Sequence, residues 1–238
     1  MQPEYLARLS EPVQHFVREV EDDAGVEIIV IPDIKQNEGG TTGQGNLAAD
    51  IGAKRIHLFA PTTGYLPDGG VRHEVLHAWR FHVMGVPKLA LAEMVNMDMS
   101  LSSRLTHIDN AIEHVIIVPI ELRLHPERRD HWERVMRDAC SDLPNVPERD
   151  LRLALCLHWT FLRHVMPDSP SFALTRDFAS KHAMLEIADA FADRFISSMG
   201  SKAEIVRRLF ELFPDLPRNR SALEYINSRT GTRQEAIP

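Results

Sequence analysis

The sequence predicts an α+β fold that is predominantly helical, with a small N-terminal β-sheet and a helical C-terminal lobe. Short runs rich in β-branched residues, each stopped by a proline, lie within the first 60 residues. From about residue 126 onward, apolar residues recur at helical spacing between prolines. Because the chain has 238 residues and 44% hydrophobic content, it can bury a substantial core. We therefore expect two lobes, an α/β lobe at 1–103 and a helical lobe at 104–238.

The N-terminal lobe is expected to alternate helices and strands. Apolar residues at helical spacing predict an amphipathic helix over residues 4–22. The runs Val26–Ile31 and Arg55–Ala60 are rich in β-branched and aromatic residues and predict two strands. Residues 36–46 contain four glycines among Asn, Thr and Gln, without the Lys-Ser/Thr ending of a phosphate-binding loop, so we expect a plain loop or a substrate flap.

The stretch from His73 to His77 reads H-E-x-x-H. A turn at 66–70 precedes it and Gly85 follows it, so the motif is predicted to lie on a helix of about 14 residues. On a helix, two histidines four residues apart lie one turn above the other on the same face. Both imidazoles can then bind one Zn²⁺, with Glu74 beside them to take a proton from water.

The remaining chain is predicted to be mostly helical. Residues 88–103 are rich in Met and Leu and are interpreted as irregular core packing. A helix over 105–124 is apolar on every side, so we expect it to be buried, with a kink at Pro119. The tail at 230–238 is expected to be loose. Apolar periodicity predicts further helices at about 126–139, 147–166, 181–199, 201–213 and 220–228.

A catalytic zinc site needs a third protein ligand. The helix at 105–124 is the best source, because polar residues in an apolar helix need partners. Its polar residues Asp109, Asn110, Glu113 and His114 lie on overlapping faces of the helix, so we expect this cluster to face the metal. Spacing alone leaves Glu113 and His114 open as the third ligand, with Asp109 and His107 as weaker alternatives.

Together, these residues resemble the zincin superfamily of metallopeptidases, and most closely its gluzincin branch. The resemblance covers about 60 residues, from 55 to 114, and includes the H-E-x-x-H helix with the strand before it. It implies Zn²⁺ as cofactor, His73, His77 and Glu113 as metal ligands, and Glu74 as the catalytic general base. In that branch the third ligand is a Glu on a separate downstream helix, and Glu113 lies 36 residues beyond His77.

The chain departs from the branch at one position. Four residues after the third-ligand Glu the branch has Asp, whereas this chain has Ile117. Asp109 or Asn110 could instead accept a hydrogen bond from a ligand histidine.

The resemblance implies a metallopeptidase that hydrolyses protein or peptide amide bonds. A zincin substrate adds as a strand to a sheet edge, so Arg55–Ala60 or a strand near 46–52 is expected to supply that edge. The sequence does not select the donor to the oxyanion from the available side chains, which include Tyr65, Tyr225, His158, His164 and His182. Alternative functions are a non-peptidase zinc amidohydrolase and a zincin-fold regulatory or binding protein.

Charge and composition argue against some partners. A net charge of −7 argues against nucleic acid or anionic lipid as the main partner, so we expect neither. No segment resembles a secretory signal or a membrane span, and two cysteines imply no disulfide framework, so a cytoplasmic protein is expected. The oligomeric state is not indicated. A local group of arginines near the C-terminus is interpreted as a solvated helix end and loop: Arg207, Arg208, Arg218 and Arg220.

Overall fold

The computed structural model describes residues 1–38, 45–92 and 98–237, which fold as two compact units. The predicted α+β, mostly helical class is confirmed. Unit 1 comprises residues 1–88, 120–128 and 224–233. Unit 2 comprises residues 89–119, 129–223 and 234–238. Two short segments from the second half of the chain therefore belong to the N-terminal unit.

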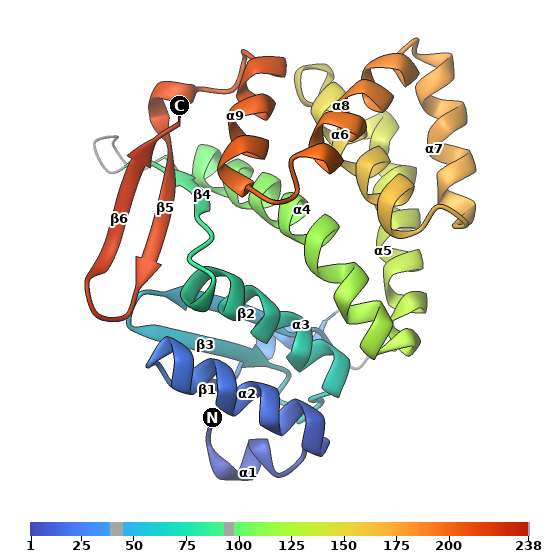
Figure 1. Cartoon of the computed structure of the whole chain (residues 1–238). Coiled ribbons are helices and arrows are strands. Elements are labelled where there is room, and N and C mark those ends of the chain that lie inside the picture. Colours follow the sequence, from blue (N-terminus) through green and yellow to red (C-terminus); the bar gives the residue numbers. More distant parts are fainter. Residues whose placement is uncertain (39–44, 93–97, 238) are drawn as a thin grey trace. The chain divides into compact units, whose positions relative to one another are not determined.

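The sheet of unit 1 has the strand order β1-β3-β2 (Figure 1). Strand β1 (Ile28–Pro32) runs parallel to β3 (Arg55–Ala60), and β2 (Ala48–Gly52) runs antiparallel to β3. The two predicted strands are thus present, together with a strand in the 46–52 region. Because β3 is paired on both sides, Arg55–Ala60 cannot supply a sheet edge to a substrate, and that alternative is wrong.

The helix predicted over residues 4–22 is two helices, α1 (Pro3–Leu6) and α2 (Glu11–Ala24). Pro12 explains the break, because proline has no N–H to donate and its ring clashes with the carbonyl four residues earlier. Helix α2 ends at Gly25, whose φ of 64° is left-handed and favours glycine. Next to β1, Ile34–Asn37 form a 3₁₀ turn, whereas residues 39–44 of the predicted loop lie outside the described residues.

The predicted motif helix is α3 (Asp68–Ala78), which continues as one π-helical turn over Trp79–Val83. The predicted stop is also present, since Gly85 has a φ of 65°. Helices α2 and α3 pack on the sheet through one apolar cluster. Its best-buried members come from both helices and from the strands: Val13, Val17, Val20, Ile28, Val30, Ile56, Leu58, Val71, Val75 and Ala78.

Helix α4 is longer than predicted, running from Met99 to Leu124 with Pro119 inside it. The preceding segment is not wholly irregular, because Lys88–Leu91 form strand β4. Residues 93–97, which include two of the methionines noted above, lie outside the described residues. The buried face of α4 includes Leu105, Ile112 and Val115, as expected for an apolar helix.

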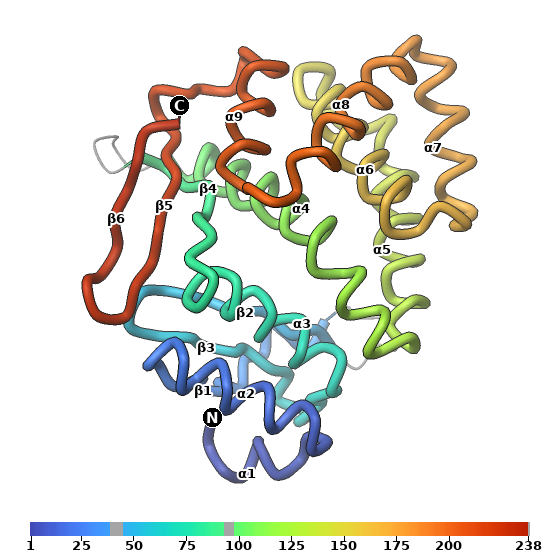
Figure 2. The backbone as a smooth tube through the Cα atoms, in the orientation of Figure 1, coloured from blue at the N-terminus to red at the C-terminus, as the bar shows by residue number. Residues whose placement is uncertain are grey.

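The C-terminal helices of unit 2 follow one another from α5 to α9 (Figure 2). Four of them correspond to predicted helices: α5 (Arg129–Asp142), α6 (Glu148–Val165), α8 (Leu185–Ser197) and α9 (Lys202–Leu212). Helix α7 (Pro170–Lys181) was not predicted. The helix predicted at 220–228 is wrong, because Ser221–Asn227 form strand β5, and the tail predicted to be loose contains strand β6 (Gly231–Ala236). A second sheet has the order β4-β5-β6.

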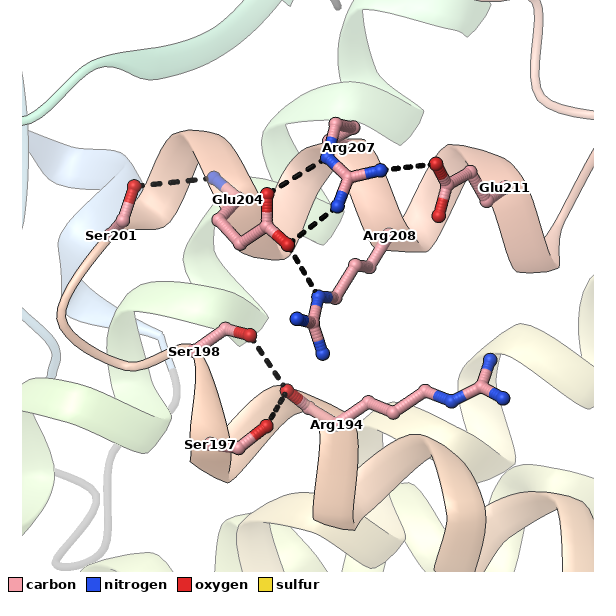
Figure 3. A network of polar contacts seen from close by, with 8 residues as sticks. All are labelled: Arg194, Ser197, Ser198, Ser201, Glu204, Arg207, Arg208 and Glu211. Carbon is pink, nitrogen blue, oxygen red and sulfur yellow. Dashed lines mark hydrogen bonds and ion pairs between the residues drawn. The ribbon is translucent and has the colours of Figure 1, made fainter.

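The C-terminal arginines are mostly held by carboxylates. On α9, Arg207 and Arg208 bond to Glu204, and Arg207 also contacts Glu211 (Figure 3). Arg220 lies 2.8 Å from a carboxylate oxygen of Asp98. These pairings neutralise much of the local positive charge, which agrees with the interpretation of a solvated helix surface. Within the described part of the chain, we find no helix with the length and apolar character needed to span a membrane.

Candidate metal centre

Helix α3 places the two motif histidines one turn apart, as predicted. The ring centroids of His73 and His77 are 5.0 Å apart, with the ring planes at 83°. Each residue is 6% exposed, so both imidazoles are buried although each can carry a charge. The opposite side of α3 contributes Val71, Val75 and Ala78 to the core of unit 1, which sets the rotation of the helix.

A buried carboxylate orients the first histidine. The Nδ1 atom of His73 lies 2.8 Å from Oε2 of Glu121, which is completely buried. When Nδ1 donates its proton to this carboxylate, the lone pair of the neutral ring is on Nε2. Metal-binding histidines are commonly oriented by such a bond from the other ring nitrogen. The contact with Glu121 therefore leaves Nε2 of His73 as the ring nitrogen that could bind a metal.

Glu121 is held in its charged form. Its other oxygen, Oε1, accepts a hydrogen bond of 2.6 Å from Nε of Arg128. Burial alone would raise the pKa of the Glu121 carboxyl, but the hydrogen bond and charge of His73, followed by the charge and hydrogen bond of Arg128, outweigh it. Together they hold the pKa at about 2. A carboxylate that stays ionised at neutral pH keeps accepting the proton of His73 Nδ1.

Glu74 lies between the two histidines in the sequence, and its carboxyl has a raised pKa. Burial raises the pKa of its carboxyl above the ordinary value, and the nearby charge of Glu121 raises it further. His73, Arg128 and a hydrogen bond from the Ala49 backbone N–H act in the opposite direction. A raised pKa makes a carboxylate a better proton acceptor near neutral pH. The Ala49 contact also places this carboxylate beside the edge strand β2.

Two of the candidate third ligands have another partner. In unit 2, Nζ of Lys202 lies 2.7 Å from Oδ1 of Asp109 and 2.8 Å from Oε1 of Glu113. The side chains of Lys202 and Glu113 are completely buried, and Asp109 also accepts a bond of 2.6 Å from the Leu89 N–H. The expected metal ligand Glu113 is thus an ion-pair partner of an ammonium group.

The other candidates differ in exposure. His107 and Asn110 lie on the exposed side of α4, which does not fit a ligand or a buried supporting residue. His114 is half-buried, and its ring meets Trp132 edge-on with the centroids 5.0 Å apart. Of the four alternatives from the sequence, His114 is the one with a sheltered imidazole.

Glu121, Arg128 and Lys202 were not identified from the sequence. Glu121 follows the apolar run Val115–Val118, and an acid in a buried helix needs a partner, so that signal was present. Lys202 also carried a signal. It is the first residue of α9, directly after the N-cap Ser201, where the helix dipole disfavours a cation. A lysine at such a position suggests a carboxylate partner elsewhere in the fold.

The donor chemistry of unit 1 fits a transition metal such as zinc. Two buried imidazoles, one of them oriented through Nδ1 by an ionised carboxylate, are typical zinc ligands. Comparisons of the chain with protein-family models, curated proteins and solved structures give no match. The assignment of this centre therefore depends on its own residues.

Proposed function

We propose that this protein is a zinc-dependent metallopeptidase that hydrolyses amide bonds of proteins or peptides. The observation that supports this most strongly is the orientation of His73 by Glu121, one helical turn from His77 and beside Glu74. A structural histidine pair needs neither the orienting carboxylate nor a neighbouring acid with a raised pKa.

The roles of the residues follow from their chemistry. A zinc ion, when bound, would polarise the scissile carbonyl and acidify the attacking water. Glu74 would accept the proton of that water and pass it to the leaving amine. His73 and His77 would hold the ion through lone pairs of their ring nitrogens, and Glu121 would keep His73 in the tautomer that allows this.

We propose His114, rather than the expected Glu113, as the third ligand. His114 precedes Glu121 by seven residues on α4, so helical periodicity turns the two side chains to within about 20° of each other. Glu113 is turned by about 80° from Glu121 and is paired with Lys202. Three imidazoles are also a donor set that zinc accepts in catalytic sites.

The edge strand β2 is the proposed platform for the substrate. It is the antiparallel outer strand of its sheet, and its Ala49 N–H reaches the general base Glu74. A peptide added along β2 would bring its backbone next to that carboxylate.

Metal analysis tests the zinc assignment. The purified protein should contain about one zinc per chain, and His73→Ala, His77→Ala and His114→Ala should each lose it. Glu113→Gln is the matched control on α4, and it should retain zinc because Glu113 is assigned to Lys202. A folded protein that takes up no zinc would refute the proposal. Zinc loss in Glu113→Gln with retention in His114→Ala would return the third-ligand role to Glu113.

Cleavage profiling tests the reaction. Wild type and Glu74→Gln are incubated with a cell lysate, and new peptide termini are compared by mass spectrometry. We expect the variant to retain zinc and to lose the cleavages. Identical profiles with zinc bound would exclude Glu74 as the base and favour a regulatory protein. Cleavage of small amides but not of peptides would favour a non-peptidase amidohydrolase.

A further inference from the structure

Each oxygen of the Glu121 carboxylate accepts a hydrogen bond from a different residue. Oε2 accepts from Nδ1 of His73 at 2.8 Å, and Oε1 accepts from Nε of Arg128 at 2.6 Å. Because Glu121 is completely buried, its rotamer depends on these contacts. Arg128 is thus in a position to set the direction in which Oε2 faces the imidazole.

Gly69 makes room for this arrangement. It lies in the first turn of α3, one turn before His73. A Cβ at position 69 would lie 2.7 Å from Cγ and 2.9 Å from Cδ of Arg128, closer than real Cβ contacts. Glycine inside a helix is less stable than alanine at the same position. The space required by the Arg128 stem gives a reason for glycine at this position.

We propose that Arg128 is a positioning residue of the metal centre, held across Gly69 so that it keeps Glu121 against Nδ1 of His73. This inference depends on the proposed zinc function for its effect on metal binding. The positioning itself concerns the tautomer of His73, which exists without metal. If Arg128 and Glu121 formed only an ordinary surface salt bridge, removing Arg128 would change neither the tautomer of His73 nor the zinc affinity.

A double-mutant cycle between Gly69 and Arg128 tests the inference. In the wild-type background, Gly69→Ala should weaken zinc binding about tenfold, because disturbing an orienting partner of a ligand typically costs 10–100-fold. Arg128→Ala should do the same. Adding Gly69→Ala to Arg128→Ala should have little further effect, because the two nearest atoms, Cγ and Cδ of Arg128, are gone. The contact that remains, to Cβ of His125 at 3.3 Å, requires a shift of only a few tenths of an ångström.

The neighbouring glycine provides a matched control. A Cβ at Gly70 would meet Leu47 at 3.1 Å and Pro67 at 3.2 Å, and Arg128 is not among its nearest atoms. Gly70→Ala should therefore leave zinc affinity unchanged in both backgrounds. Arg128→Lys should recover affinity only in part, because lysine supplies the charge without the planar Nε–H of arginine.

A second readout does not need zinc. In the metal-free protein, ¹⁵N shifts of the His73 ring report which nitrogen carries the proton. Wild type should show Nδ1–H, and Gly69→Ala and Arg128→Ala should both reduce its population. Additive effects of the two substitutions on zinc affinity, or an unchanged His73 tautomer in Arg128→Ala, would overturn the inference. If wild type binds no zinc, the zinc proposal fails and the tautomer experiment alone decides the role of Arg128.

Discussion

Replacing Lys202 by methionine should strongly destabilise unit 2. The ammonium of Lys202 lies 2.7 Å from Asp109 and 2.8 Å from Glu113, in a site where the lysine is completely buried. At an effective dielectric constant of 20, each of these distances corresponds to a gross attraction of about 6 kcal/mol. Desolvation of the ions offsets much of that attraction. Removing one member of a buried ion pair nevertheless costs about 3–5 kcal/mol, because it leaves uncompensated charge.

We therefore expect Lys202→Met to lower the free energy of unfolding by about 3–5 kcal/mol. Urea denaturation followed by circular dichroism measures this change. Lys181→Met replaces an exposed lysine on α7 and should change the free energy by at most about 0.5 kcal/mol.

Neutralising the carboxylates as well should restore most of the loss. In the triple variant Lys202→Met, Asp109→Asn and Glu113→Gln, no buried charge is left unpaired at this site. A loss below about 1 kcal/mol in Lys202→Met would refute the assignment of a buried ion-pair network. A triple variant no more stable than Lys202→Met would show that the loss is not electrostatic.

Two further predictions concern groups of unit 2 whose pKa burial shifts. Burial lowers the pKa of His158 to about 4. Below about pH 6.5 the imidazole is therefore protonated in the unfolded chain but not in the folded protein. The free energy of unfolding should be highest above pH 6.5 and should fall by up to about 3 kcal/mol towards pH 4. His158→Gln should flatten this dependence in urea titrations at several pH values, and an equal slope in both proteins would contradict it. Burial raises the pKa of Cys156 to about 12 and also raises the pKa of Cys140. At pH 8 a thiol reagent should therefore leave Cys156 unmodified and label Cys140 slowly until the protein unfolds. Mass spectrometry measures this labelling. Native labelling of Cys156 at the rate of a free thiol would be inconsistent with its burial.

Local patterns predicted the local structure well. Each of these local features depends on residue types and spacing within a window of about 15 residues, which the sequence shows directly. They are the H-E-x-x-H helix, its end at Gly85 and the strands before the helix. The one-turn separation of His73 and His77 follows from the same spacing. The position of Glu74 between the two histidines is likewise read directly from the sequence.

Features set by distant pairing were missed. Ser221–Asn227 is short enough to suit either a helix or a strand, and one of its two partner strands, β4, lies more than 100 residues earlier. The contact from Glu121 to His73 spans 48 residues, and Lys202 approaches α4 from a separate helix. The sequence indicated that these polar residues needed partners, but it could not say which ones.

The outward backbone groups of the edge strand β2 have a further consequence. The N–H of Ala49 is bonded to Glu74, and the carbonyl of Ile51 accepts a bond of 2.8 Å from Nζ of Lys88. Side chains of the protein itself therefore protect this edge against indiscriminate pairing with other chains. A peptide that pairs with β2 has to take over the Ala49 N–H, which removes from Glu74 a hydrogen bond that lowers its pKa. Under the proposed function, strand addition would thus release the Glu74 carboxylate from Ala49 as a peptide backbone arrives.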